Sequence, residues 1–70
     1  MRVLLRNVQT GQFYVGPEQW SETDAEAMDF GDTELALDCV WENHLTGMEV
    51  VMRFDEPFFE IPLRVVASGR

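Results

Sequence analysis

The chain has 70 residues and a formal net charge of −8, because five arginines stand against thirteen carboxylates and lysine is absent. Hydrophobic residues make up 46% of the sequence, which is too large a share for a disordered acidic tail. A chain of this size buries only about 60% of the surface that it exposes when unfolded. The composition therefore predicts one small acidic domain with a core and excludes a deep enclosed pocket.

The sequence carries no recognisable targeting segment. Apolar runs fall short of the roughly 20 residues that span a bilayer, and the N-terminus lacks the basic and then apolar pattern of a signal peptide. The lone Cys39 has no partner for an internal disulfide, which favours a reducing compartment. We therefore expect a cytoplasmic protein that starts at Met1, folds as a single α+β domain over residues 1–66, and ends in a flexible tail at residues 67–70.

Residues 2–8 and 13–15 are rich in β-forming side chains and flank a glycine-containing turn, so they predict a hairpin. A two-residue loop at Thr10 and Gly11 and a bulge near Gly11 both fit this segment, and the register stays open. Pro17 ends the second strand, because proline cannot donate a ladder hydrogen bond.

The stretch that follows this hairpin is acidic and polar. Trp20 is its largest apolar side chain, and we expect it to anchor the loop onto the core. Apolar residues return at residues 27–30, where we predict a short strand.

A helix is marked at both ends, since Asp32 is a good N-cap and Gly47 is a natural C-terminal stop. At the angular step of a helix, five side chains fall within one arc of about 140°. These side chains are Ala36, Leu37, Val40, Trp41 and His44. We expect this arc to cover one face of a sheet.

The last two strands have a register that several pairs determine together. With a connection at residues 55–58, apolar pairs share one face and charged pairs the other. The apolar pairs are Phe54 with Phe59, Met52 with Ile61, Val50 with Leu63 and Met48 with Val65, and the charged pairs are Arg53 with Glu60 and Glu49 with Arg64. Pro62 indicates that the last strand lies at an edge or directs its missing donor away from the ladder.

These elements predict an α+β fold of the order β-β-(β)-α-β-β. Four or five strands form a mainly antiparallel sheet, and one helix packs on one of its faces. The other face is then at least partly open to water.

Catalytic and metal-binding motifs fail when their spacing is tested. Glu22, Asp24 and Glu26 alternate like calcium ligands, but an EF-hand loop from Asp24 needs glycine at its sixth position, where Asp29 stands. His44 has no second histidine to share a metal. The chain has no glycine-rich phosphate loop and too few basic residues to neutralise a nucleic acid backbone. We expect no enzyme, no cofactor, no metal site, and no direct binding of nucleic acid or membrane.

The charge layout is the main functional signal. Between Asn7 and Met52 there are ten carboxylates and no basic residue. Such a surface either keeps a small domain in solution or docks a basic partner by electrostatic complementarity. Our leading hypothesis is a non-enzymatic protein-interaction module that docks a basic protein surface. The candidate partner-binding residues are Glu22, Asp24, Glu26, Asp38 and Glu42.

Two other functions fit the sequence. An edge strand at residues 59–65, or an apolar exposed sheet face, would form a homodimer. A shallow groove beside Trp20 would bind a small ligand.

The order of features resembles that of a group of small uncharacterised bacterial proteins, a domain of unknown function. The resemblance rests on residues 9–14, the isolated Trp20, residues 27–30, the helix start at residues 33–37 and the strand at residues 49–51. It spans most of the chain, and its motifs are structural. It implies a bacterial source and a shared fold, and it carries no catalytic or ligand residue over to this chain.

Overall fold

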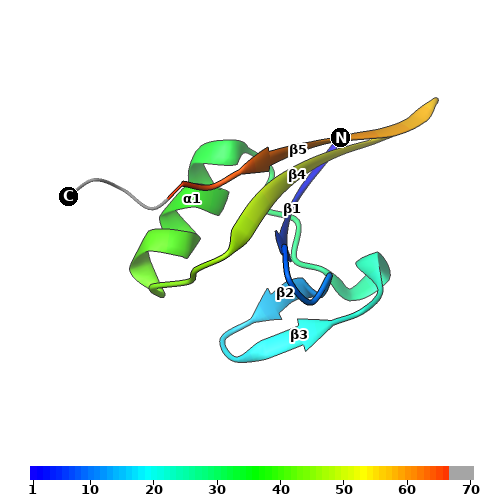
Figure 1. The fold of residues 1–70 in the computed structure, drawn as a ribbon. Coiled ribbons are helices and arrows are strands. Elements are labelled where there is room, and N and C mark those ends of the chain that lie inside the picture. The colour runs from blue at the N-terminus through cyan, green and yellow to red at the C-terminus, as the bar shows by residue number, and fades with distance from the viewer. Residues whose placement is uncertain (67–70) are drawn as a thin grey trace.

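The computed structural model describes residues 1–66. The expected tail at residues 67–70 lies outside this range. The described part comprises the strands and helices drawn in Figure 1. They are β1 (Arg2–Asn7), β2 (Phe13–Gly16), β3 (Gln19–Ser21), the 3₁₀ turn η1 (Asp24–Glu26), the helix α1 (Thr33–Glu42), β4 (Met48–Asp55) and β5 (Phe58–Arg64).

The strands form one antiparallel sheet in the spatial order β3-β2-β1-β4-β5. The helix α1 packs against β1 and β4 on one face of this sheet. The predicted α+β fold is therefore confirmed. Figure 1 shows that the tip of the β4–β5 hairpin extends away from α1, so the helix covers only part of the sheet.

The predicted register of the β4–β5 hairpin is confirmed. Its pairs include Phe54 with Phe59, Met52 with Ile61, Val50 with Leu63, Arg53 with Glu60 and Glu49 with Arg64. The Val65 amide donates to the Met48 carbonyl at 3.0 Å, which continues the ladder past β5. Because hydrogen-bonded pairs alternate along antiparallel strands, Pro62 directs its missing donor to the outer edge. Proline is tolerated there, since β5 is an edge strand.

The turn between β1 and β2 is longer than a two-residue loop. Arg6 pairs with Phe13, and the Asn7 amide donates to the Gln12 carbonyl at 2.8 Å. Gly11 adopts a positive φ of 77° and donates to the Asn7 carbonyl, which closes the turn. The register that the sequence left open is therefore set by a four-residue loop.

The predicted strand at residues 27–30 is wrong. This segment is irregular, and it is tied down by single hydrogen bonds from Met28 to Tyr14 and from Phe30 to Val3. The third strand is β3 instead, which pairs with β2 through Tyr14 and Trp20. Its polar neighbours in sequence conceal it, because only Trp20 of its three residues is apolar.

The start of α1 agrees with the sequence, and its end does not. The Asp32 side chain accepts a hydrogen bond from the Leu35 amide at 2.8 Å, as an N-cap does. The helix ends at Glu42, several residues before Gly47. His44 takes the positive φ of 55° that usually falls to glycine, and the Leu45 amide donates to the Val40 carbonyl at 2.9 Å. These features define a Schellman turn.

The early end of α1 changes its buried side. Ala36 and Val40 are buried and Leu37 is half-buried, as expected. The predicted burial of Trp41 and His44 is wrong, since both are exposed. Cys39 packs on the core instead, so the buried arc is rotated toward β2 and away from Trp41.

Apolar side chains fill both sides of β1, because successive residues of a strand point to opposite faces. The larger cluster lies under the helix and includes Val3, Leu5, Tyr14, Ala36, Val40, Met48 and Val50. A smaller cluster of Leu4, Phe13 and Val51 lies on the far face. The helix α1 does not cover this smaller cluster; Ala27 packs against it, and the guanidinium groups of Arg6 and Arg53 lie over the Phe13 ring.

Candidate functional site

A network of ion pairs covers the face of the sheet that α1 leaves free. Its contacts are Arg6 with Glu49 at 2.7 Å and with Glu60 at 3.2 Å, Arg53 with Glu60 at 2.7 Å and with Asp24, and Arg2 with Asp24 at 3.4 Å. We call these six residues the arginine network. They join β1, β4, β5 and η1, so the network ties the two halves of the chain together.

Arg53 is the centre of this network and is only 6% exposed. Its guanidinium lies over the rings of Phe13 and Phe58, at 5.4 and 5.6 Å from their centroids. The hydrogen bond from Arg53 holds the pKa of the Glu60 carboxyl below its usual value; burial opposes this shift and Arg6 adds to it. A buried charge is tolerated only when it is paired, so Arg53, Asp24 and Glu60 have a structural role.

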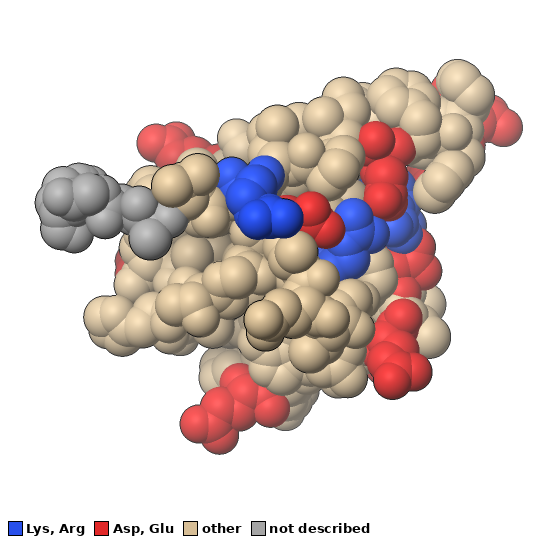
Figure 2. Space-filling model, in the orientation of Figure 1, with Lys and Arg blue, Asp and Glu red and all other residues tan. Residues whose placement is uncertain are grey.

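The five carboxylates predicted to bind a partner do not form one surface. Asp24 belongs to the arginine network, whereas Glu22 and Glu26 are exposed beside it. Asp38 and Glu42 are exposed on α1, which lies across the molecule from η1 in Figure 1. Figure 2 shows the arginines gathered beside a few carboxylates, while the other acidic groups are scattered around the outline.

An apolar surface that the charge layout did not reveal lies on β5. Phe59, Ile61 and Leu63 are 45%, 40% and 47% exposed, and they lie on the same side of the sheet as the helix. We call these three residues the β5 stripe. The Phe59 ring stacks on that of Phe54, with centroids 4.5 Å apart and planes 14° apart. Because α1 packs on β1 and β4, it leaves the stripe open to solvent. In the sequence, the three stripe residues alternate with Glu60 and Pro62, and this alternation is the signal for the surface.

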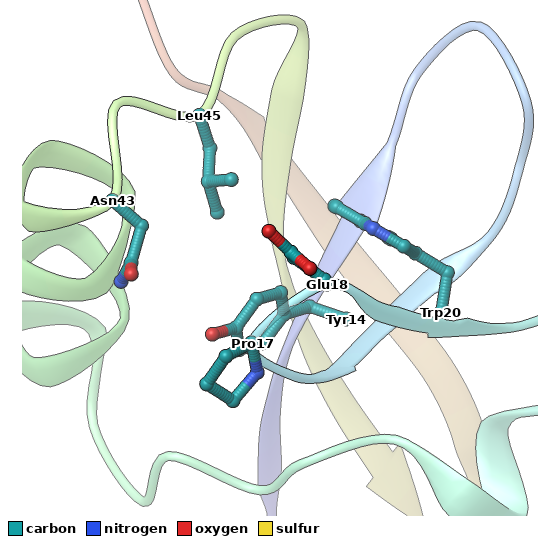
Figure 3. Close-up of a pocket in the computed structure, with 6 residues that line it drawn as sticks. All are labelled: Tyr14, Pro17, Glu18, Trp20, Asn43 and Leu45. Carbon is teal, nitrogen blue, oxygen red and sulfur yellow. The ribbon is translucent and has the colours of Figure 1, made fainter.

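A pocket of about 290 Å³ lies between the β2–β3 hairpin and the end of α1 (Figure 3). We call it the Trp20 pocket. It is lined by Tyr14, Pro17, Glu18, Trp20, Asn43 and Leu45. The expected groove beside Trp20 therefore exists, although the sequence did not identify its other walls. Asn43 and Leu45 are distant in sequence and reach the pocket only because α1 ends in the Schellman turn.

The aromatic wall of this pocket consists of Trp20 and the buried Tyr14, whose rings are in contact. The rings of Tyr14 and Trp20 meet edge to face, with centroids 5.5 Å apart and planes 83° apart. Tyr14 is buried, with only 4% of its surface exposed. Burial, and next the neighbouring Cys39 thiol, raise the pKa of its hydroxyl. The neutral Tyr14 ring therefore packs against the edge or face of Trp20 from the buried side of the pocket.

Among residues 1–66, histidine, cysteine and acidic side chains form no group of three that would hold a metal ion. The part of the chain described by the structure contains no helix long and apolar enough to cross a membrane. Comparison with protein-family models, curated proteins and solved structures found no match for this chain.

Proposed function

We propose that this protein is a non-enzymatic interaction module that docks a protein partner on the β5 stripe. The partner has an apolar centre and a basic rim. The observation that carries this proposal is the exposure of Phe59, Ile61 and Leu63 on a strand that α1 does not cover. Adjacent apolar side chains on the surface of a small protein are typical of interaction sites.

The β5 stripe suits docking because it contains no charge. Glu60 and Arg64 alternate with the stripe residues along β5 and point to the opposite face. A partner that covers the stripe therefore desolvates apolar groups and leaves the ion pairs of Glu60 in place. Buried aromatic and aliphatic anchors of this kind supply most of the affinity in protein interfaces.

The charge of the surrounding surface favours a basic partner. Asp55 and Glu56 are exposed at the tip of the hairpin, and Asp55 pairs with Phe58 on the face opposite the stripe. Arg2, Arg6 and Arg53 are engaged in the arginine network, and Arg64 is exposed on the face of β5 opposite the stripe. The exposed charge that an approaching protein meets is therefore mainly negative, which steers a basic surface toward this one.

A homodimer is the second candidate, and one observation favours it. Phe59 and Leu63 flank Ile61 symmetrically, so two stripes can pack face to face around a twofold axis. Pairing through the edge of β5 is disfavoured, because Pro62 lacks the outward donor that such a ladder needs. The net charge of −8 on each copy opposes self-association and places this candidate second.

A photo-crosslinking amino acid at position 61 tests the proposal in the native host. The matched control carries the same amino acid at position 41, where Trp41 is exposed on α1, outside the β5 stripe. We expect the amino acid at position 61 to crosslink to a protein other than a second copy of this chain. At position 41 we expect no crosslink. Reversing the charges of Asp55 and Glu56 to arginine should weaken this capture.

Light scattering of the purified chain over a concentration series separates the two candidates. The proposal expects a monomer mass throughout. A mass that doubles with concentration, together with crosslinks between two copies at position 61, would replace the proposed partner with a second copy. Equal capture at positions 41 and 61 would remove the stripe as the docking surface.

A further inference from the structure

We propose that the Trp20 pocket binds a methylated ammonium group, such as the headgroup of choline or the side chain of trimethyllysine. This site is separate from the β5 stripe and stands independently of the proposed docking function. Its volume of about 290 Å³ lies just below the usual range of about 300–1,000 Å³ for ligand pockets, so it suits one headgroup rather than an extended molecule.

The sign of the ligand charge follows from the lining. Glu18 contributes a carboxylate, and the other five residues around the pocket are neutral. Within residues 1–66, Glu18 has no ion-pair partner, so its charge is available to a ligand. In the view of Figure 3 this carboxylate lies between the Trp20 ring and Leu45. An aromatic ring beside a carboxylate attracts cations and repels anions.

The backbone at Glu18 supports a role for its side chain. Gly16 pairs with Gln19, so Pro17 and Glu18 are the two central residues of the β2–β3 turn. Glu18 has a φ of 60°, in the left-handed region that glycine and asparagine prefer at the second central position of such a turn. A glutamate in this conformation strains the backbone, and strained residues of this kind cluster at functional sites. The strain at Glu18 therefore supports a role for its carboxylate in the pocket.

The number of hydrogen-bond acceptors favours a methylated cation. A primary ammonium has three N–H donors and a guanidinium has five, and both require several acceptors when they leave water. The lining side chains offer the Glu18 carboxylate, the Oδ1 of Asn43 and the Tyr14 hydroxyl as acceptors, and in Figure 3 the hydroxyl points toward Asn43 and away from the carboxylate. Glu18 is therefore the only lining side chain that brings an acceptor next to the Trp20 ring in this view. Pro17, Trp20 and Leu45 present apolar surface. Methyl groups on nitrogen match these walls and keep the positive charge next to the ring.

Fluorescence titration of a Trp41→Phe protein tests this proposal, because Trp20 is then the only tryptophan. The probes are choline and 3,3-dimethylbutanol, its neutral isostere, at constant ionic strength. We expect a saturable change with choline and none with the isostere. Glu18→Gln should weaken choline binding roughly two- to fivefold, whereas Glu22→Gln, an exposed control outside the pocket, should leave it unchanged.

The source of the cation is resolved by a second arm with peptides. A peptide that contains trimethyllysine should bind more tightly than the same peptide with lysine. Tighter binding of the peptide than of choline assigns the site to a protein-borne cation, and the reverse assigns it to a free one. A lack of saturation with choline, equal binding of the neutral isostere, or unchanged binding by Glu18→Gln would overturn the proposal.

Discussion

The two faces of β5 differ in what lies against them. On one side Glu60 is held by Arg6 and Arg53, and on the other side the β5 stripe is exposed. The same strand therefore has one face fixed by charge and one face that nothing in residues 1–66 covers. Ion pairs and the ladder hold the hairpin in register, so its apolar side chains need not be buried to keep β5 in place.

The largest expected effect is on the free energy of unfolding, and it comes from a comparison of a core leucine with a leucine of the stripe. Leu5 is fully buried under α1, whereas Leu63 is 47% exposed on β5. Leu5→Ala should lower the free energy of unfolding by about 2–5 kcal/mol, because it leaves a cavity. Leu63→Ala should lower it by less than about 1 kcal/mol.

Urea denaturation measures both variants under the same conditions. A loss for Leu63→Ala as large as that for Leu5→Ala would mean that the stripe is part of the folding core. The contrast between the two sides of β5 would then fail, and the stripe would no longer be free for a partner.

The arginine network should give the next largest effect. Arg53→Met keeps the apolar stem and removes the charge, which leaves Asp24 and Glu60 without their buried partner. We expect a loss of about 2–3 kcal/mol in the free energy of unfolding. Arg64→Met is the matched control, because Arg64 is exposed on the neighbouring strand β5, and it should change stability by less than about 0.5 kcal/mol. Thermal denaturation of the two variants compares them directly, and equal losses would contradict a special role for Arg53.

The end of α1 gives a smaller effect of the opposite sign. His44→Gly should raise the free energy of unfolding by about 0.5–1 kcal/mol, because glycine adopts the positive φ of this position without strain. Glu42→Gly, at the last residue of the helix, should instead lower it by less than about 1 kcal/mol. Because α1 packs on β1 and β4, neither change at its end should alter the exposure of the β5 stripe. Chemical denaturation gives the stabilities, and a destabilised His44→Gly protein would contradict the Schellman turn.

The sequence determined the β4–β5 hairpin well because local pairs agreed. Phe54 with Phe59 and Arg53 with Glu60 satisfy apolar and charged neighbours in one register only. The N-cap at Asp32 was equally readable, since a cap depends on a few adjacent residues. These are short-range features, and the sequence displays both partners close together.

The sequence-based predictions differ from the structure where contacts between residues distant in sequence determine the local structure. His44 ends α1 despite being a poor residue for that backbone, because the chain must turn there to reach β4. Asp24 looked free to bind a partner, yet Arg2 and Arg53, both distant in sequence, take it into the arginine network. The walls of the Trp20 pocket and the uncovered stripe likewise depend on where α1 packs. Charge counting therefore pointed to carboxylates that do not form one surface, whereas the apolar surface entered the sequence analysis only as the homodimer alternative at residues 59–65.

The smallest effect separates the charged side of β5 from the general acidity of the chain. The pKa of Glu60 is lowered in the folded state, mainly by the hydrogen bond from Arg53. A lowered pKa means that this carboxylate stabilises the fold above the unfolded-state value of about 4.3 and stops doing so as the pH falls through the folded-state pKa. Glu60→Gln should therefore be less stable than the parent at neutral pH, and the difference should shrink in acid.

Urea denaturation at several pH values measures that difference, with Glu56→Gln as the exposed control. Glu56→Gln should follow the parent at every pH, because its carboxylate lies at the hairpin tip, exposed to water. A deficit of Glu60→Gln that stayed constant into acid would mean that its carboxylate charge does not hold β5. The register would then rest on the ladder and on the Phe54 and Phe59 stack, and the apolar face would be the one that keeps the strand in place.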